Sequence, residues 1–470
     1  MSFAKYPAYK DSGVEWLGEV PAHWHVKRLR HVAMLNPSKS EVAHFPRDAE
    51  VSFLPMEAVG EDGTLNLDRT RPIGEVESGY TYFREGDVTV AKITPCFENG
   101  KGAVMRGLHN GHGFGTTELI VARPSEGSAT SDYLHLLFTS HPFRLLGEAS
   151  MYGAGGQKRV PDDFVRNFAV AFPPLSEQTA IATFLDRETT KIDALVAEQE
   201  KLIALLQEKR QAVISHAVTK GLNPNAPMKD SGVEWLGEVP AHWEVRRVKH
   251  LVTTLEQGWS PQCEGFPVQS DEEWGVLKVG CVNGGVFRPE ENKTLPLELE
   301  PVPELGVAAG DLLISRANTR ELVGGAAVAL LDYPRLMLCD KLYRIRFRPE
   351  TCEPVFLALY LSTPRIRGQI ELAATGASSS MLNIGQSTIL ELDVAVPPLD
   401  EQRQILNVVS DQIDNANALV VQARTAITLL QERRTALISA AVTGQIDVRG
   451  WAGSLNTPVL IASSAYTASA

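Results

Sequence analysis

Residues 176–219 read SEQTAIATFLDRETTKIDALVAEQEKLIALLQEKRQAVISHAVT and determine how the rest of the chain can fold. The stretch contains neither Gly nor Pro, and its Ala, Leu, Glu, Gln, Lys and Arg residues are strong helix formers. Pro173 and Pro174 precede it, Ser176 is a candidate N-cap, and Gly221 follows as a stop signal. We therefore predict a single helix about 65 Å long.

Apolar residues in this stretch recur in steps of three and four, as in the seam of a coiled coil. A helix of this length with one apolar stripe needs a partner helix. Residues 400–443 supply it, because they also lack Gly and Pro and end at Gly444. The predicted seam residues are Ile181, Leu185, Ile192, Leu195, Leu202, Leu206 and Val213 in the first helix, and Val409, Leu419, Leu430 and Leu437 in the second. Gln199, Ala416, Ala423 and Ala426 on the seam indicate close helix approach and a fixed register.

The two helices belong to an internal duplication. PPLSEQTAI, from residue 173, matches PPLDEQRQI, from residue 397, and the helix ends match at the same offset of 224 residues. The segment KDSGVEWLGEVPAHW at 10–24 returns unchanged at 229–243. The chain therefore consists of a block, a helix, a second block and a second helix.

The interiors of the blocks, residues 36–165 and 255–390, hardly match in sequence, although both carry β patterns. Residues 86–105 and 310–330 each predict strand, polar loop and strand, and a later small-residue loop leads to a strand before each long helix. We predict an α+β fold, with two pseudo-symmetric α+β domains separated by two long antiparallel coiled-coil helices, and with the blocks at opposite ends of the helix pair. The predicted boundaries are 1–172, 173–222, 223–396, 397–444 and a loosely held tail at 445–470.

Composition limits the possible classes of protein. The 470 residues suit several domains, and the sequence contains no apolar run long enough to span a membrane and no secretory signal. Five cysteines without a zinc-ligand spacing indicate reduced thiols in the cytoplasm. The formal charge of −12 argues against a basic surface over the whole molecule but allows a local one.

Motifs for chemistry are missing from the sequence. There is no phosphate-binding loop for ATP, no Asn-Pro-Pro-aromatic or Asp-Pro-Pro-aromatic motif for a flipped adenine, no nucleophile elbow and no metal-ligand pair on a helix. The adjacent carboxylates Asp162-Asp163 and Glu272-Glu273 are typical of solvated turns. His23-Trp24 and its repeat His242-Trp243 could stack on a base, but their place in the invariant frame favours packing or subunit docking. We predict that the chain directs chemistry without performing it.

The PPLSEQ and PPLDEQ motifs, the segments GDVTVAK and GDLLISR, and the duplicated frame resemble the specificity subunit of type I restriction-modification enzymes. The resemblance covers nearly the whole chain up to about residue 447. It implies that each block is a target recognition domain for one half of a split double-stranded DNA sequence, and that the helices form a spacer. It also implies docking of two methyltransferase (modification) subunits and two ATP-dependent restriction subunits. Those partners would use S-adenosylmethionine, ATP and Mg, with no cofactor or metal bound by this chain.

DNA-contact candidates follow from residue type and loop position, since Arg and Lys suit guanine or phosphate, and Asn and Gln suit adenine. In the first block these are Lys92, Thr94, Asn99, Lys101, Gln157, Lys158 and Arg159. In the second block they are Arg316, Asn318, Arg320, Ser378, Ser379, Ser380 and Asn383. Each of these could also be an ordinary solvated loop residue.

Two other functions remain open from the sequence. A helical protein-interaction scaffold that never touches DNA would agree with the net acidity. A self-sufficient methyltransferase is disfavoured by the missing motifs, and binding of a methyl donor by the isolated chain would revive it.

Overall fold

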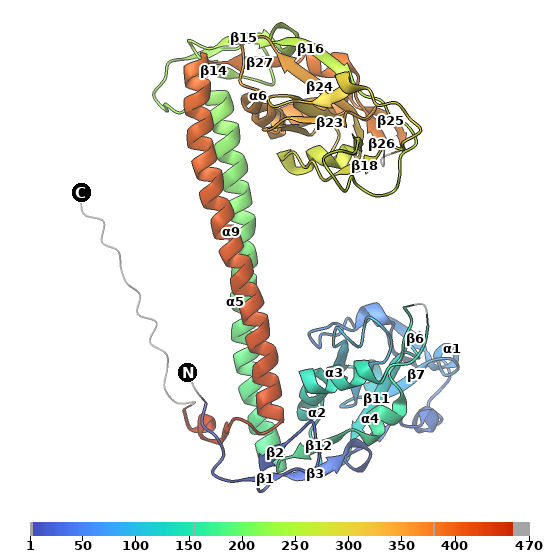
Figure 1. Ribbon diagram of the computed structural model, residues 1–470. Helices are drawn as coiled ribbons and strands as arrows, with labels where there is room; N and C mark the ends of the chain where they lie inside the picture. The colour runs from blue at the N-terminus through green and yellow to red at the C-terminus, as the bar shows by residue number, and fades with distance from the viewer. Residues whose placement is uncertain (1–2, 155, 379–380, 455–470) are drawn as a thin grey trace, which may run out of the picture. The chain divides into compact units, whose positions relative to one another are not determined.

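The computed structural model describes residues 3–154, 156–378 and 381–454 (Figure 1). The chain divides into two compact units: unit 1 extends to Gln199 and resumes at Thr425, and unit 2 runs from Glu200 to Arg424. Helix α5 (Leu175–Lys220) begins in unit 1 and ends in unit 2, whereas α9 (Leu399–Val442) does the reverse. Each unit therefore contains the start of one long helix and the end of the other.

Unit 1 has two four-stranded sheets and two strand pairs among its described residues. The first sheet consists, in spatial order, of β6 (Thr70–Pro72), β5 (Glu50–Leu54), β10 (His112–Gly115) and β7 (Thr81–Arg84). The second consists of β4 (Ala33–Leu35), β11 (Leu119–Pro124), β8 (Val88–Ala91) and β9 (Gly102–Val104). The pairs are β1 (Tyr9–Asp11) with β2 (Glu19–Pro21), and β3 (His25–Arg28) with β12 (Ala169–Phe172). The short helices are α1 (Ile73–Val76), α2 (Ser131–Thr139), α3 (His141–Ala149) and α4 (Asp162–Asn167).

Unit 2 repeats this plan with an additional three-stranded sheet. Its four-stranded sheets are β16 (Val252–Gln257), β24 (Leu342–Phe347), β20 (Leu312–Ser315) and β22 (Ala326–Val328), then β18 (Asn292–Thr294), β17 (Gly275–Leu277), β23 (Tyr333–Met337) and β19 (Gly306–Val307). The smaller sheets are β13 (Met228–Asp230) with β14 (Glu238–Pro240), β15 (Glu244–Arg247) with β27 (Asp393–Val396), and β21 (Ala317–Asn318) with β26 (Met381–Asn383) and β25 (Thr375–Ser378). The short helices are α6 (Pro354–Leu361), α7 (Pro364–Ala373) and α8 (Gln386–Leu390).

Both predicted hairpins are present, since β8 pairs antiparallel with β9 and β20 pairs antiparallel with β22. The predicted loop before each long helix contains, in addition, the short helix α4 or α8. Among the described residues, no helix is both long enough and apolar enough to cross a membrane.

The long helices pair antiparallel. In unit 1 the start of α5, through Ile181 and Leu185, shares a hydrophobic core with Leu437 and Ala441 near the end of α9. An ion pair of 3.0 Å between Asp193 and Arg434 lies in the same unit. In unit 2 the end of α5 and the start of α9 share the corresponding core. The start of each helix therefore lies beside the end of the other, as the sequence predicts.

The buried stripe of the helices differs from the predicted seam at three positions. Ile181, Leu185, Ile192, Val409, Leu437 and Ala423 are buried, whereas Leu206, Val213, Leu430, Gln199, Ala416 and Ala426 are half-buried. Leu195, Leu202 and Leu419 are instead exposed, by 51%, 40% and 46%. Their neighbours Val196, Ile203 and Val420 are half-buried and continue the stripe. The prediction was wrong at these three leucines because both members of each adjacent pair are apolar, so the pattern alone does not fix the helix face.

The repeated motifs form the joint between each helix and its domain. Glu177 accepts hydrogen bonds from Trp24 Nε1 (3.0 Å) and the Tyr6 hydroxyl (2.6 Å), and its other oxygen lies 2.8 Å from His23 Nε2. In unit 2, Glu401 lies in the same way against Trp243 Nε1 (3.1 Å) and His242 Nε2 (2.7 Å). Trp24 and Trp243 are fully buried, so packing and not base stacking explains them.

The glutamine that follows each of these glutamates makes a second connection. Gln178 Nε2 donates to the Pro173 carbonyl (3.0 Å), while its Oε1 accepts from the Thr130 amide (2.9 Å). Gln402 makes the matching bonds to the Pro397 carbonyl (2.9 Å) and the Glu353 amide (2.8 Å). The Glu-Gln pair of each PPL motif thus fixes the helix start to its domain.

Two local expectations need correction. Helix α5 begins at Leu175, so Ser176 lies inside the helix and is not its N-cap. The chain after the second helix is not loose at its start, because Arg449 lies over the Tyr6 ring and the Trp451 ring packs on Phe184. The Asp447 amide also donates to the Ala4 carbonyl at 2.8 Å.

Candidate nucleic-acid interface

In unit 1, the structure brings together the two segments that the sequence singles out. The Lys92 amide donates to the Glu118 carbonyl (2.8 Å), and the Val160 amide donates to the Lys92 carbonyl (2.8 Å). Ile93 and Tyr152 each form an antiparallel bridge with Arg159. The tip that follows β8 and the Gly-rich loop therefore form one surface.

The side chains on this surface are partly held by other protein groups. Arg159 grips the Glu118 carboxylate through Nη2 (2.7 Å) and Nε (3.0 Å), whereas Thr94 donates to Glu98 (2.8 Å) and Asn99 to Glu61 (2.8 Å). The hydrogen bonds from Arg159, together with the charge of Lys92, lower the pKa of Glu118.

The remaining predicted side chains of this surface differ in exposure. Lys101 donates to the Met56 carbonyl (3.2 Å), and Lys92 is half-buried. Gln157 and Lys158 are exposed beside Tyr152, which is itself 64% exposed. The surface offers cations, an amide and an aromatic ring to a ligand, a combination suited to nucleic acid.

Unit 2 has the same backbone arrangement. The Arg316 amide donates to the Lys341 carbonyl (2.8 Å), and the Ile384 amide donates to the Arg316 carbonyl (3.0 Å). Ala317 and Thr375 both pair with Asn383, within the sheet formed by β21, β26 and β25. Lys92 and Arg316, like Arg159 and Asn383, are 224 residues apart, which is the offset of the duplication.

The side chains in unit 2 are different. Arg316 donates to the Asp340 carbonyl (3.2 Å), a group that Gln257 also reaches (3.1 Å). Asn318 is held by Ser315 (3.3 Å) and Asn283 (3.4 Å), and Arg320 is exposed. Asn383 is half-buried in β26, and Ser378 ends β25. Ser379 and Ser380 lie outside the described residues.

Sequence reasoning missed one position of this surface. The Glu118 carbonyl in unit 1 and the Lys341 carbonyl in unit 2 accept the same backbone hydrogen bond, so these residues occupy equivalent places with opposite charges. Applying the 224-residue offset to the loops, where the side chains no longer match, could have indicated the pairing. The equivalent trios are Lys92, Glu118 and Arg159 in unit 1, and Arg316, Lys341 and Asn383 in unit 2.

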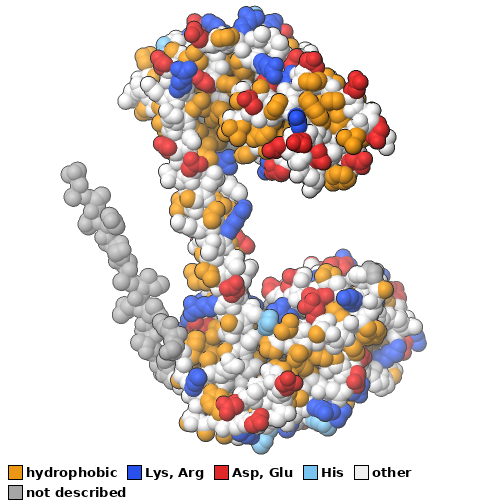
Figure 2. All heavy atoms as spheres, in the orientation of Figure 1, with side chains coloured by type: hydrophobic (Ala, Val, Ile, Leu, Met, Phe, Trp, Pro, Cys, Tyr) orange, Lys and Arg blue, Asp and Glu red, His pale blue; other side chains and the backbone are white. Residues whose placement is uncertain are grey.

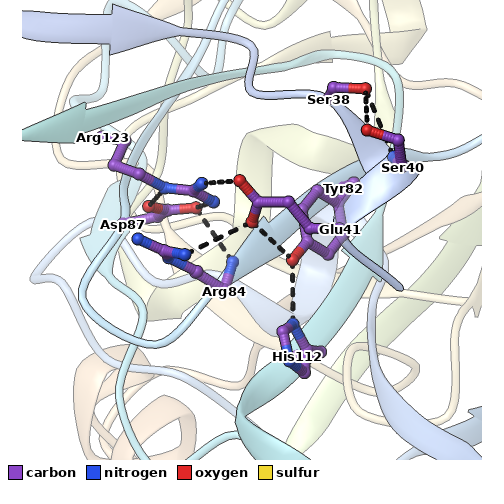
Figure 3. A network of polar contacts seen from close by, with 8 residues as sticks. All are labelled: Ser38, Ser40, Glu41, Tyr82, Arg84, Asp87, His112 and Arg123. Carbon is purple, nitrogen blue, oxygen red and sulfur yellow. Dashed lines mark hydrogen bonds and ion pairs between the residues drawn. The ribbon is translucent and has the colours of Figure 1, made fainter. Parts of the chain in front are cut away.

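A polar network holds the base of the first hairpin (Figure 3). Figure 3 shows Arg123 between two carboxylates: its Nε and Nη2 donate to Asp87 (2.7 and 2.8 Å), and its Nη1 donates to Glu41. The Tyr82 hydroxyl bridges Glu41 (3.1 Å) and His112 Nδ1 (2.8 Å). Burial and the charge of Glu41 raise the pKa of Tyr82 to about 12, and burial lowers the pKa of His112. Asp87 immediately precedes β8, so this network anchors the strand that carries Lys92.

A related pair anchors the second hairpin. Asp311, before β20, accepts from Arg346 Nε at 2.7 Å, and this hydrogen bond raises the pKa of Arg346. The hairpins therefore have equivalent supports beneath tips of different composition. Among the described residues, no group of three or more His, Cys, Asp or Glu side chains is arranged to hold a metal ion.

Comparison with known proteins agrees with this architecture. The chain is 28% identical to the EcoEI specificity subunit of a type I restriction enzyme from Escherichia coli, over 90% of this chain and 83% of the relative. It is 42% identical to the EcoAI specificity subunit from Escherichia coli, over 40% of this chain and 31% of the relative. The chain belongs to the specificity subunits of type I restriction enzymes.

Solved structures share the fold of this specificity subunit. A chain solved in work on complex assembly of the type I R-M system matches it with a TM-score of 0.70 and 18% identity, covering 90% of this chain and 98% of that one. The HsdS subunit from Thermoanaerobacter tengcongensis matches with a TM-score of 0.56 and 18% identity, covering 91% and 98%. No family model matches the sequence.

Proposed function

We propose that this specificity subunit binds a bipartite target in double-stranded DNA, with each unit reading one half-site. The observation that carries the proposal is the pair of equivalent surfaces described above. Their backbones superimpose in hydrogen-bond pattern, whereas Lys92, Glu118 and Arg159 are replaced by Arg316, Lys341 and Asn383. A shared frame with different donors and acceptors is suited to reading two different base sequences in the same manner.

The chain also docks two copies of a modification subunit on the paired helices. Exposed leucines occur in equivalent pairs, Leu195 (51%) with Leu419 (46%), and Leu205 (52%) with Leu429 (59%). Unit 1 contains Leu195 and Leu429, and unit 2 contains Leu419 and Leu205, so each unit presents one leucine of each pair. Figure 2 shows such hydrophobic side chains on the outer surface of the helices. Two equivalent apolar patches suit two identical partners.

The chemistry belongs to the partners in this proposal. Modification subunits methylate DNA with S-adenosylmethionine, and two restriction subunits use ATP and Mg to cleave unmodified DNA. This chain supplies target choice and assembly. Its support comes from the names of the relatives, which are specificity subunits of type I restriction enzymes.

Two measurements test the proposal. Methylome sequencing of the host with and without the gene should reveal a split methylated sequence that depends on this chain. A mobility shift with the assembly that copurifies with the chain should then favour that sequence, with a steep dependence on salt. Absence of a gene-dependent methylated sequence, together with no DNA shift, would favour the protein-interaction scaffold.

The docking surface can be tested separately. Leu195→Asp with Leu429→Asp should remove one modification subunit, and Leu419→Asp with Leu205→Asp should remove the other, because a charge at an apolar contact opposes binding. Native mass spectrometry of the assembly reads the stoichiometry. Retention of both copies in the two double variants would place docking elsewhere.

A further inference from the structure

The two-stranded sheet formed by β3 and β12 carries cations whose neutral partner differs from that of the equivalent sheet in unit 2. Arg28 Nη1 and Arg30 Nη1 both donate to one oxygen, Asn167 Oδ1, at 3.5 and 2.7 Å. The Asn167 amide nitrogen is occupied with Asp163, through its carbonyl (3.1 Å) and its carboxylate (2.8 Å). These bonds orient the amide oxygen toward the two arginines.

In unit 2 the same place is filled by a carboxylate. Arg247 and Lys249, the counterparts of Arg28 and Arg30, both donate to Glu391, at 2.7 and 3.0 Å. The hydrogen bond and charge of Lys249, with the charge of Arg247, lower the pKa of Glu391. Two cations that converge on a carboxylate are neutralised by it, whereas two cations that converge on an amide are not.

Two further carboxylates of unit 2 are missing from the matching positions of unit 1. Asp393 lies 3.8 Å from Arg247, and its counterpart in the strand pairing is Ala169. Glu244 forms an ion pair with Arg246, and its counterpart is His25, beside Lys27.

The local charge of unit 1 is correspondingly positive. Lys27, Arg28, Arg30 and Arg166 are exposed. The nearby carboxylates of α4 are engaged with amides, Asp163 with Asn167 (2.8 Å) and Asp162 with Asn36 (3.0 Å). Unit 1 therefore holds a positive site in a protein whose overall formal charge is −12.

We propose that Arg28 and Arg30, converging at Asn167, form a binding site for a phosphate group of duplex DNA outside the half-site that unit 1 reads. The inference rests on the proposed function, since DNA is the ligand. Guanidinium groups present several N–H donors in a planar fork that matches phosphate oxygens, and contacts of this kind position a protein on the duplex without reading bases. Only unit 1 has the site, so the complex grips flanking DNA on one side of its target.

Asn167→Glu is the sharpest test, because unit 2 already folds with a carboxylate at this position. The assembly purified through a tag on this chain is bound to two duplexes that contain the mapped target. One duplex ends at the target and the other extends by about 15 base pairs on each side. For the longer duplex, the slope of log K against log[salt] should fall in magnitude by about 1–2, which corresponds to one or two lost phosphate contacts. For the short duplex the slope should stay the same.

Matched variants define the controls. Arg28→Ala with Arg30→Ala should reproduce the effect, and Arg28→Lys should retain most of the slope. Arg247→Ala with Lys249→Ala removes the same charge from unit 2 and should leave the slope unchanged, because Glu391 already neutralises those cations. Glu391→Asn with Asp393→Ala should increase the slope on the longer duplex.

The outcomes are distinguishable. Equal slopes for the parent and Asn167→Glu would overturn the site, as would equal effects of the two double alanine variants. Unchanged DNA slopes with loss of a partner subunit from the Asn167→Glu assembly would instead assign the site to an acidic protein surface. Failure of the parent to prefer the mapped target on the short duplex would contradict the proposed function itself.

Discussion

Single carboxylates decide how the heads of this protein are attached. Glu177 is 6% exposed and satisfies Tyr6, Trp24 and His23 together. Burial, with the hydrogen bond to Glu177, raises the pKa of Tyr6, so the phenol remains a donor. In sequence, Glu177 is visible only as one letter of a repeated motif. Its partners lie more than 150 positions away, a separation that local periodicity does not report.

Glu177→Ala should destabilise unit 1 by about 2–4 kcal/mol, because it leaves buried donors of Tyr6 and Trp24 without an acceptor. Glu401→Ala should cost unit 2 less, since Glu401 is 26% exposed. Thermal unfolding of the full chain, followed by hydrogen exchange in each unit, measures both effects. Equal losses would show that burial of the carboxylate does not govern the joint.

A buried histidine makes unit 1 sensitive to acid. Burial lowers the pKa of His135 to about 4, and its Nδ1 is enclosed without a hydrogen-bond partner among the described residues. The unfolded chain takes up this proton near pH 6.5, above the folded pKa, so stability falls as pH decreases between these values. We expect a loss of up to about 3 kcal/mol across this window.

Denaturant unfolding of unit 1 at pH 7 and pH 4.5 measures this loss. His135→Gln serves as the control, because it removes the titrating group and should flatten that part of the pH profile. An unchanged profile in the variant would assign the acid sensitivity to other groups.

The long helices show what pattern can and cannot predict at the level of elements. Their existence, antiparallel pairing and ends at Gly221 and Gly444 follow from composition, repetition and helix stops. The register of the stripe does not, because Leu195-Val196, Leu202-Ile203 and Leu419-Val420 each offer two apolar candidates. The partner helix selects the β-branched member in all three pairs, and the leucines are left on the surface.

Truncations on the two sides of the stripe should differ sharply. Ile192→Ala removes a side chain that is 5% exposed and should destabilise unit 1 by about 2–4 kcal/mol. Leu195→Ala, only three residues away, should change stability by less than about 1 kcal/mol, since its side chain is half in water already. Chemical denaturation of the two variants compares them, and similar losses would return Leu195 to the seam.

At the scale of the whole molecule, the duplication predicted the plan of block and helix, and the candidate contact loops were correctly placed beside each other. What the sequence could not show was the exchange of Glu118 for Lys341, or of Asn167 for Glu391, because these positions correspond only through backbone pairing. Side-chain identity within the loops has diverged too far for alignment by eye.

Replacing residues 36–165 with the corresponding block of another specificity subunit should change one half-site of the methylated sequence and leave the other intact. The reason is that the variable surface lies within one unit, whereas the joint lies in the repeated frame. Methylome sequencing of cells that carry the chimera reads the outcome. A change in both half-sites would contradict independent reading by the units.

The identical Glu-Gln joints have a consequence for inheritance. Each head meets its helix through the same few hydrogen bonds, whatever loops it bears, so a gene segment that encodes a new head can be spliced between the flanking repeats without disturbing the attachment. New combinations of half-sites then arise by recombination in one event, and natural variants should differ by whole heads more often than by scattered loop residues.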